Sequence, residues 1–452
     1  MDIDLIKYNT NEKLSEYFLK EFSITNKPIP VSFRDLIPKL NSIGKYPHLI
    51  HSYPAKLIAH IPNFFLNNNY FSKKGGVVLD PFCGTGTVLL EAMISGRNSR
   101  GADANPLAQL ISKVKTTYLS DEILKLNLEL IIITYKTIEK PEIPEIINRD
   151  FWFSLENQKK LGLIKRAINE TTIDDIRDFF LICFSNCVKK VSYADPRVAV
   201  PVKLNPKRYP DRSNKYKKTL KKIKDVETID ILTLFKTICT NNIQSVSNLK
   251  SFNNKVTAKV VSDDARKLTR DIGTSKLIEN ESIDLIITSP PYAGAQKYIR
   301  SSSLNIGWLG MALPDELRFL DKKNIGRENY IKQDIKKITT GIISADILLE
   351  KVYSVNKIRA YIVGNYLVEM MDALDESVRV LKKNSYLILI VGNNKVSNFE
   401  FNTQQYLTEY LISKKLSLKF KLIDDIKSYG LMTKRNKTAD IISREWVLVF
   451  KK

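Results

Sequence analysis

One short stretch has the composition of a site for a flat ligand that carries an amino group: Thr288-Ser289-Pro290-Pro291-Tyr292. It follows an apolar run, 283–287, that predicts a buried strand. Two successive prolines remove two backbone donors and fix φ, so the turn is stiff and its carbonyls stay free. The carbonyls and Ser289 can accept hydrogen bonds from an amine, and Tyr292 can stack on a ring. This combination suits a base pulled out of a nucleic-acid duplex; the alternative interpretation is a tight strand-to-loop turn.

A glycine-containing turn is the second candidate site. The apolar run 77–80 is consistent with a buried strand, and an apolar-patterned helix that ends near Gly96 follows the turn. Glycines let the backbone approach a ligand closely, and a helix N-terminus directs free amides at it. The turn consists of Asp80, Pro81, Phe82, Cys83, Gly84, Thr85, Gly86 and Thr87.

Acidic residues at the ends of later strands indicate the kind of ligand. Asp103 ends a short strand about 20 residues past the turn, where an acid can hold ribose hydroxyls. Another predicted strand, within 257–265, also ends in an acid, Asp264. No strict GxGxxG is present, and no lysine follows the second glycine as in a phosphate-binding Walker loop. S-adenosylmethionine, which has a ribose but no pyrophosphate, fits this pattern.

The positive charge indicates a polyanionic partner. The formal net charge is +22, and residues 189–224 are rich in Lys and Arg with only Asp195 and Asp211 against them. Prolines and tyrosines interrupt this run, which favours a loop that follows a phosphate backbone over a merely solvated charge run. A second basic region spans 293–345. The candidate DNA contacts are Arg197, Lys203, Lys207, Arg208, Lys297 and Arg300.

Composition narrows the class of protein further. With 452 residues and 43% hydrophobic residues, the chain can bury a large core. We find no apolar stretch of about 18 residues that would span a membrane. We also find no basic and apolar leader, so a cytoplasmic protein of a bacterium or archaeon is expected. The four cysteines lack paired spacing and the three histidines lie at 48, 51 and 60, so reduced thiols are expected and no metal site.

Alternating strands and helices, with acids at the ends of successive strands, predict an α/β fold with an open, mostly parallel sheet. Asp80, Asp103, Asp264 and Ser289 would face the crevice at the strand ends. Helices are expected over much of 116–250, over 346–382 and at 403–415, and strands at 386–394, 417–424 and 445–450. The expected organisation is an N-terminal helical extension (1–45), a first nucleotide-binding part (46–115), a helical insertion with the basic segment (116–250), and a second part (251–452) in which 293–345 forms a loop region.

The two motifs together resemble those of a known family. Residues 80–87 and 288–292 look like the cofactor and catalytic motifs of amino-group (N4-cytosine/N6-adenine) DNA methyltransferases of bacterial restriction–modification systems. The stretch from His51 to Lys56 is similar to a segment that precedes the cofactor motif in one branch of that family. The stretches 151–153 and 391–394 also have counterparts, so the resemblance spans roughly 45–452. It implies a Rossmann-like S-adenosylmethionine-dependent methyltransferase fold.

The resemblance also implies roles for individual residues. Asp80 and the glycines would shape the methionine side of the cofactor, Asp103 would bind its ribose, and Asp264 with Ala265 would face its adenine. The segment from Tyr53 to Lys56 would close over it. In full, the implied cofactor residues are Tyr53, Pro54, Lys56, Asp80, Pro81, Phe82, Cys83, Gly84, Thr85, Gly86, Thr87, Asp103, Ala104, Asn105, Asp264 and Ala265. The implied catalytic residues are Ser289, Pro290, Pro291 and Tyr292, with Ser289 and the Pro290 carbonyl accepting from the target amine and Tyr292 stacking on the flipped base.

The reaction implied is methyl transfer to the exocyclic N4 amine of cytosine in double-stranded DNA, with a cognate restriction endonuclease as a further partner. In this family, Ser ahead of the two prolines goes more often with cytosine, and Asp with adenine. Three alternatives stay open: an N6-adenine DNA methyltransferase, a tRNA guanine-N2 methyltransferase, and a non-catalytic nucleic-acid-binding subunit. Target recognition is assigned to 190–250, to 293–345, or to both.

Overall fold

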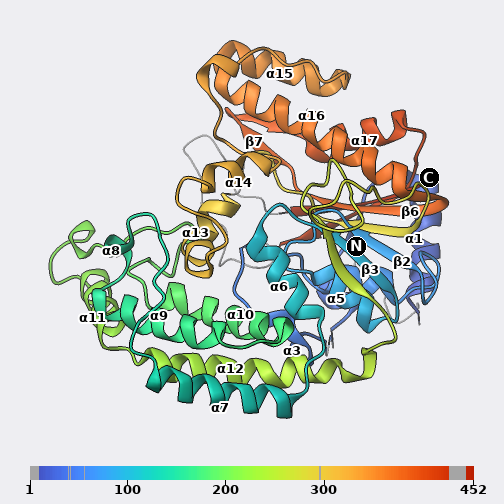
Figure 1. Cartoon of the computed structure of the whole chain (residues 1–452). Helices are drawn as coiled ribbons and strands as arrows, with labels where there is room; N and C mark the ends of the chain where they lie inside the picture. Colours follow the sequence, from blue (N-terminus) through green and yellow to red (C-terminus); the bar gives the residue numbers. More distant parts are fainter. Residues whose placement is uncertain (1–9, 39, 41, 55, 295–296, 427–443) are drawn as a thin grey trace.

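A single twisted sheet organises the molecule (Figure 1). The computed structural model describes residues 10–38, 40, 42–54, 56–294, 297–426 and 444–452. Residues 1–9 of the expected N-terminal extension and 295–296 of the region 293–345 lie outside this range. Within it, eight strands pair in the order β1-β9-β10-β6-β5-β2-β3-β4. Their bounds are β1 (Ile29–Val31), β2 (Val77–Asp80), β3 (Asn98–Ala102), β4 (Ala258–Ser262), β5 (Ile283–Thr288), β6 (Leu381–Val391), β9 (Ser417–Asp425) and β10 (Arg444–Lys451).

The five neighbouring strands from β6 to β4 are parallel, and β10 runs antiparallel to both β6 and β9. The prediction of an open, mostly parallel α/β sheet is therefore confirmed. The edge strand β1 was not foreseen: its three residues come from the extension predicted as helices and loops, and they pair with β9. A separate two-stranded ribbon joins β7 (Asn394–Val396) and β8 (Phe399–Phe401).

The register of the strands brings the candidate residues to one edge. Asp80 is paired with Gly101, and Leu79 with Ile286, so β2, β3 and β5 end at the same level. Strand β5 is buried on both faces, which explains its continuous run of Ile and Leu. Residues directly beyond these strands therefore meet at the carboxyl edge, where open α/β sheets bind ligands.

Helices cover both faces of the sheet (Figure 1). One core cluster joins the sheet to α16 and α17, with α15 packed on α16, and another joins it to α1, α4 and α5. The expected helix 346–382 is two helices that meet at Asn356, whose side chain caps the second. The bounds are α1 (Asn11–Thr25), α2 (Phe33–Leu36), α3 (Ser42–Lys45), α4 (His60–Leu66), α5 (Thr87–Ile94), α15 (Ile343–Val355), α16 (Lys357–Val380) and α17 (Thr403–Ser413).

A helical lobe stands beside the sheet, at the lower left of Figure 1. It contains α7 (Asp121–Thr137), α8 (Arg149–Trp152), α9 (Leu155–Asn169), α10 (Asp174–Lys190), α11 (Asn214–Thr228) and α12 (Ile231–Ser247). Helix α6 (Pro106–Thr116) lies between the sheet and this lobe, because it packs on both β4 and α10. Apart from α11, the helices of the lobe and α6 share one core cluster with α13 (Tyr298–Leu309), which reaches in from the second half of the chain and buries Trp308 there.

The loop region expected at 293–345 is therefore wrong in part, because it contains α13 and α14 (Leu317–Lys323). Apolar residues of α13 at helical spacing, such as Leu304 and Trp308, bury against the lobe. The many basic residues of the region had obscured this pattern. Across the residues described, no helix combines the length and the apolar character that crossing a bilayer requires. All four cysteines are buried and none forms a disulfide.

Candidate active site

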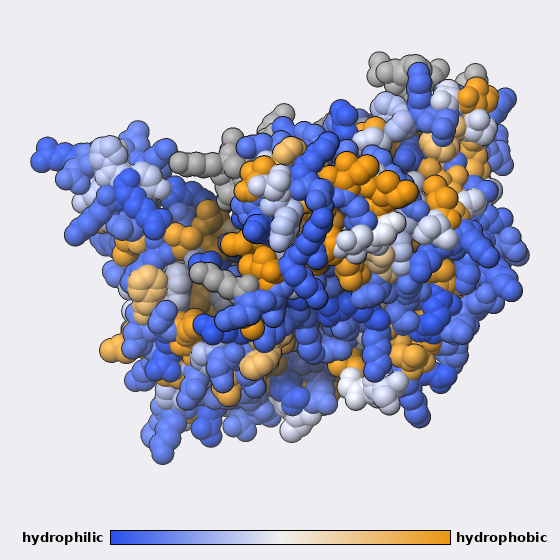
Figure 2. All heavy atoms as spheres, turned by 90° about the horizontal axis from the view of Figure 1, so that it is seen from above, coloured by the Kyte–Doolittle hydropathy of each residue, from blue (hydrophilic) through white to orange (hydrophobic). Residues whose placement is uncertain are grey.

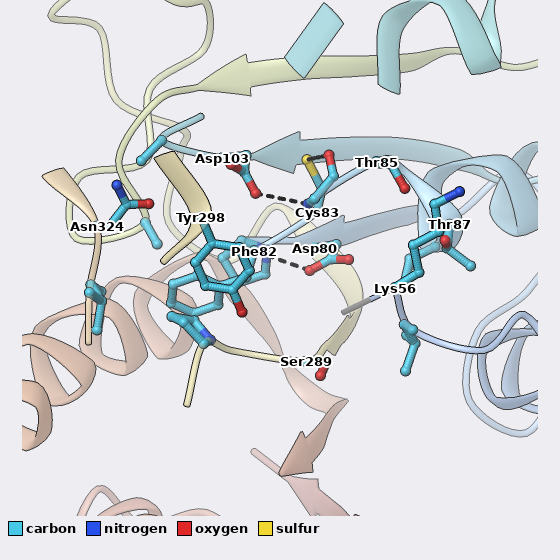
Figure 3. Close-up of a pocket in the computed structure, with 18 of the residues that line it drawn as sticks. Lys56, Asp80, Phe82, Cys83, Thr85, Thr87, Asp103, Ser289, Tyr298 and Asn324 are labelled. Carbon is cyan, nitrogen blue, oxygen red and sulfur yellow. Dashed lines mark hydrogen bonds between the residues drawn. The ribbon is translucent and has the colours of Figure 1, made fainter. Parts of the chain in front are cut away.

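A cavity lies at the carboxyl ends of β2, β3, β4 and β5 (Figure 3). Most of the residues predicted to hold a cofactor line it, together with two from the catalytic motif. These are Tyr53, Lys56, Asp80, Pro81, Phe82, Cys83, Gly84, Thr85, Thr87, Asp103, Ala104, Asp264, Ala265, Ser289 and Pro291. Thr85, Thr87 and Lys56 stand at one end of the cavity and Asn324 at the other, with Asp103, Asp80 and Ser289 between them.

Five predicted residues do not line this cavity: Pro54, Gly86, Asn105, Pro290 and Tyr292. Asn105 supports the lining, because its side chain caps α6 and donates to the Tyr53 hydroxyl at 2.8 Å. Gly86 has φ of +72°, and a Cβ there would lie 2.3 Å from Ser112 Oγ. Position 86 requires glycine because α6 packs closely against it, whereas a Cβ at Gly84 would face open space.

Several lining residues escaped the sequence prediction: Leu57, Val88, Tyr298, Lys323, Asn324 and Ile325. The last three follow one another at the end of α14 and close the far end of the cavity. A basic run in an apparent loop gives no sign of this role. Tyr298 begins α13 only a few residues beyond the catalytic motif, so its nearness in sequence was the one available signal.

Asp103 organises the turn after β2. Its Oδ2 accepts from the Gly84 amide at 2.9 Å, and its Oδ1 accepts from the Asn105 amide at 2.8 Å. Burial raises the pKa of Asp103 to about 6, although the hydrogen bonds from both backbone amides favour the ionised form. A carboxylate has further lone pairs, so Asp103 can accept from ribose hydroxyls while keeping these bonds.

Asp80 ties the two candidate motifs together. Its Oδ1 accepts from the Thr288 hydroxyl at 2.6 Å and from the Phe82 amide at 3.1 Å. Burial raises the pKa of Asp80 to about 7, and the two hydrogen bonds oppose that rise. Asp80 is only 3% exposed. A buried carboxylate that titrates near neutral pH attracts a cationic ligand, which would restore its charge.

The catalytic motif leaves its acceptors open. Ser289 is half-buried and lines the cavity, and its hydroxyl has no hydrogen-bond partner among the described residues. Tyr292 is turned to another partner: its hydroxyl donates to Glu445 Oε1 of β10 at 3.2 Å. Burial, followed by the nearby Glu445, raises the pKa of Tyr292 well above its usual value. The tract 391–394 supports this turn, because Asn394 donates to the Ala293 carbonyl at 3.2 Å.

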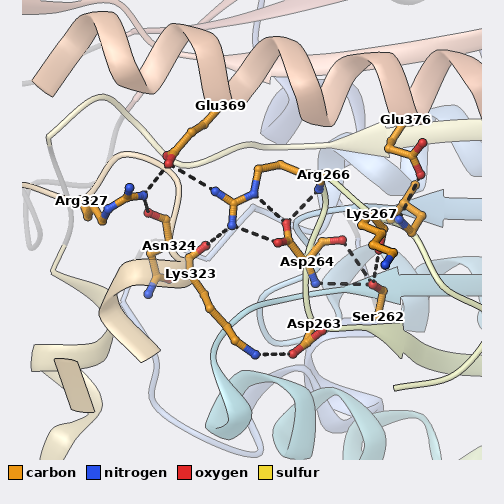
Figure 4. A network of polar contacts seen from close by, with 11 residues as sticks. Ser262, Asp263, Asp264, Arg266, Lys267, Lys323, Asn324, Arg327, Glu369 and Glu376 are labelled. Atoms are coloured by element: carbon orange, nitrogen blue, oxygen red, sulfur yellow. Dashed lines mark hydrogen bonds and ion pairs between the residues drawn. The ribbon is translucent and has the colours of Figure 1, made fainter. Parts of the chain in front are cut away.

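A charged network fixes the end of the cavity near β4 (Figure 4). Arg266 forms a fork with both carboxylate oxygens of Asp264, at 2.9 Å each, and reaches Glu369 Oε1 at 3.2 Å. Arg327 meets the same Glu369 oxygen at 2.6 Å. Lys323 pairs with Asp263 at 2.6 Å. These contacts pin the segment from Lys323 to Arg327, including Asn324 and Ile325 in the cavity wall, against the end of β4.

The predicted DNA contacts differ in how free their charges are. Lys207, Arg208 and Arg300 are exposed and have no ion pair within the described chain. Arg197 is paired with Asp195 at 2.6 Å, and Lys297 with Glu328 at 3.3 Å. Lys203 lies over the rings of Phe151, at 4.3 Å, and Tyr193, at 5.2 Å. Seen from above, the surface is mostly hydrophilic with hydrophobic groups gathered in places (Figure 2).

The cavity suits S-adenosylmethionine, because the polar and charged side chains that line it complement the polar and charged groups of that ligand. Asp103 offers a carboxylate that can accept from ribose hydroxyls, Asp80 offers a buried carboxyl that can meet a positive charge, and Lys56 at one end can meet a carboxylate. The fold and this cavity define a Rossmann-like methyltransferase that uses S-adenosylmethionine.

Comparisons with known proteins narrow the class. A family described as DNA methylase, of N6 and N4 methyltransferases, matches residues 43–114. The Type II methyltransferase M.MvaI of Kocuria varians is 26% identical over 383 residues, 80% of each chain. M.MjaII of Methanocaldococcus jannaschii is 23% identical over 66% of this chain and 69% of its own length. M.BsoBI of Geobacillus stearothermophilus is 23% identical over 69% of this chain and 66% of its own length. The predicted resemblance to amino-group DNA methyltransferases of restriction–modification type is thereby confirmed.

Proposed function

We propose that the chain transfers a methyl group from S-adenosylmethionine to the N4 amine of cytosine in duplex DNA, within a restriction–modification system. The observation that carries this proposal is Ser289. Ser289 lines the same cavity as Asp80 and Asp103, and its hydroxyl has no hydrogen-bond partner among the described residues. A serine at this place has a short side chain and offers one acceptor to an amine.

The chemistry required is modest, because S-adenosylmethionine supplies an activated methyl group. The amine of cytosine is a weak nucleophile, since its lone pair is delocalised into the ring. Hydrogen bonds from the amine to Ser289 Oγ and to the Pro290 carbonyl localise that lone pair. Orientation of the amine towards the methyl group then accounts for much of the catalysis. As the new N–C bond forms, the S–C bond breaks and S-adenosylhomocysteine leaves as the neutral thioether. The methylated amine then carries one proton too many, and it releases that proton through the Ser289 hydroxyl to water.

A flipped base needs a stacking partner, and two tyrosines offer one. Tyr292 belongs to the catalytic motif, but its hydroxyl is held by Glu445 and the residue stands outside the cavity lining. Tyr298 lines the cavity. We propose that Tyr292 bounds the pocket for the flipped base and is the first candidate to stack on it. Tyr298 is the second candidate. The energy of flipping, about a few kcal/mol, is offset by such stacking and by backbone contacts.

Duplex DNA is proposed to lie across the surface formed by the helical lobe and the start of α13. Lys207 and Arg208 on the lobe and Arg300 on α13 carry free charges suited to phosphate contacts. Lys203, Arg197 and Lys297 are proposed as weaker contacts, because each already has a partner. A cognate endonuclease that cuts the same unmethylated site is proposed as the functional partner.

The test is methyl transfer from labelled S-adenosylmethionine to unmethylated duplex DNA and, in parallel, to tRNA. The modified nucleosides are then identified by mass spectrometry. We expect N4-methylcytosine from DNA and no transfer to tRNA. N6-methyladenine would overturn the choice of base, transfer to tRNA alone would overturn the substrate, and no transfer at all would favour a non-catalytic subunit.

A further inference from the structure

A buried lysine stands directly behind the cofactor turn and has no role in the account above. Lys115, near the end of α6, is 0% exposed. Its Nζ donates to Thr85 Oγ1 at 3.2 Å, and Thr85 lines the cavity. Ser112, one helical step earlier, packs against Gly86. Two residues on one face of α6 therefore contact the turn: Ser112 packs against Gly86, and Lys115 contacts the side chain of Thr85.

No carboxylate compensates this lysine. Within the described chain, Lys115 has no ion pair. The buried Glu91 is engaged by His48 at 2.7 Å and by Asn63 at 2.8 Å. Burial, and then the neighbouring Lys56, lower the pKa of Lys115 well below its usual value. A buried cation without a counter-charge is costly, and an anionic ligand nearby removes much of that cost.

Lys56 adds a second positive charge beside the first. It lines the same end of the cavity, and its Nζ donates to the carbonyls of His51 at 2.6 Å and His48 at 3.3 Å. Burial lowers the pKa of Lys56 to about 8. Carbonyls orient this ammonium without neutralising it. Two lysines and the start of α5 thus make one end of the cavity electropositive.

The hydrogen bond between Lys115 and Thr85 orients the Thr85 hydroxyl. When an anionic ligand keeps Lys115 protonated, the ammonium can only donate, and Thr85 Oγ1 then accepts from it. The hydrogen of the Thr85 hydroxyl is then available for another acceptor, and Thr85 lines the cavity in which the ligand would supply one. An unassisted threonine hydroxyl would be free to rotate.

We propose that Lys115 is a positioning residue for the carboxylate of the methionine part of S-adenosylmethionine, acting through the Thr85 hydroxyl. This rests on the cofactor of the proposed function and is independent of which base accepts the methyl group. Lys115 supplies the counter-charge from behind and Thr85 supplies the hydrogen bond, while Lys56 faces the carboxylate directly.

The test compares two ligands by calorimetry: S-adenosylhomocysteine and its decarboxylated analogue, which keeps the amine and lacks only the carboxylate. In Lys115→Met, which keeps the length of the side chain, we expect about ten-fold weaker binding of S-adenosylhomocysteine. Binding of the decarboxylated analogue should change by less than about two-fold. Lys115→Arg should restore part of the discrimination. Lys113→Met serves as the control, since that exposed lysine pairs with Asp175 and Asp178 outside the cavity.

A second variant guards against a folding defect. Thr85→Val removes the hydroxyl and leaves the lysine in place, and it should show the same loss for S-adenosylhomocysteine. The double variant should lose little more than either single variant, because the two residues act as one unit. Equal weakening of both ligands, or no change in either, would overturn the role of Lys115. A chain that binds neither ligand in its native form would instead overturn the cofactor assignment.

Discussion

The two turns that meet in the cavity are built in opposite ways. The turn after β2 is internally satisfied: Asp103 holds the Gly84 amide, Asp80 holds the Phe82 amide, and α6 packs against Gly86. The turn after β5 leaves the Ser289 hydroxyl without a partner in the described chain. The first turn is pre-organised for a ligand that always binds in one way. The second keeps open the acceptors that the proposed function assigns to the amine of a flipped base.

The largest effect should follow from removing the hydrogen-bond acceptor in the turn after β5. Ser289→Ala removes the acceptor for the amine, and we expect the rate of methyl transfer to fall by about 10²–10³-fold. The affinity for S-adenosylhomocysteine should stay nearly unchanged, because the first turn is intact. Single-turnover kinetics and calorimetry measure the two quantities.

Thr288→Val is the matched control for that variant. It lies one residue earlier but removes the bond to Asp80 in the first turn, so cofactor affinity should suffer more than in Ser289→Ala. Tyr292→Ala should also abolish transfer with little loss of cofactor affinity. Full activity in both Ser289→Ala and Tyr292→Ala would show that the second turn is not catalytic.

The next effect concerns the rigidity of the first turn. Gly86→Ala places a methyl group 2.3 Å from Ser112 Oγ, so something must shift, and we expect a loss of about 2–3 kcal/mol in the free energy of unfolding. Gly84→Ala meets open space and should cost about 1 kcal/mol from its positive φ alone. Chemical denaturation of both variants measures the difference. Equal losses would show that α6 does not press on the turn.

A smaller effect is expected from pH. In the folded, ligand-free chain Asp80 holds its proton up to about pH 7, while in the unfolded chain it loses it near 4. Between these values the folded state binds more protons, so its stability falls as pH rises through the window. Asp80→Asn should reduce this fall, leaving the smaller part that Asp103 contributes, and should raise the melting temperature at pH 8 by a few degrees.

The same group should make cofactor binding depend on pH. The positive charges of S-adenosylmethionine favour ionised Asp80, so affinity should rise between about pH 5 and pH 8 and flatten in Asp80→Asn. Asp103, with a pKa of about 6, adds a shallower contribution over the lower part of that range. Affinity that is flat across the window in the unaltered chain would contradict the buried, titrating carboxyls.

The smallest effect separates free from paired surface cations. Lys207→Ala with Arg208→Ala should weaken DNA binding and lower the salt dependence by about one unit of slope per lost phosphate contact. Arg197→Ala should change the slope less, because its charge is already paired with Asp195. Binding measured at several salt concentrations gives the slopes. An unchanged slope in the double variant would move the DNA face towards Lys297 and Arg300.

The sequence predicted the sheet well because its signals were local. Buried parallel strands are short apolar runs, and β2, β9 and β10 lie within one residue of their predicted bounds. The shared position of the acidic residues at the strand ends could also be predicted, since parallel strands end at one edge of the sheet. Asp80, Asp103 and Ser289 duly meet in one cavity.

The parts that failed depend on contacts between distant segments. Asn324 and Ile325 reach the cavity only because Arg327 and Arg266 converge on Glu369, and those residues are far apart in the chain. The reason for Gly86 lies in Ser112 of a later helix. Lys115 gave no signal, because a lysine on a helix is normally solvated and its burial is a property of the folded chain.

The central claim is that Ser289 presents the N4 amine of cytosine to the methyl group. The most direct measurement is the methylated-nucleoside content of DNA from cells that express the unaltered chain or Ser289→Ala, with equal protein levels. The account predicts N4-methylcytosine with the unaltered chain and little or none with Ser289→Ala. N6-methyladenine, or equal N4-methylcytosine in both strains, would contradict it.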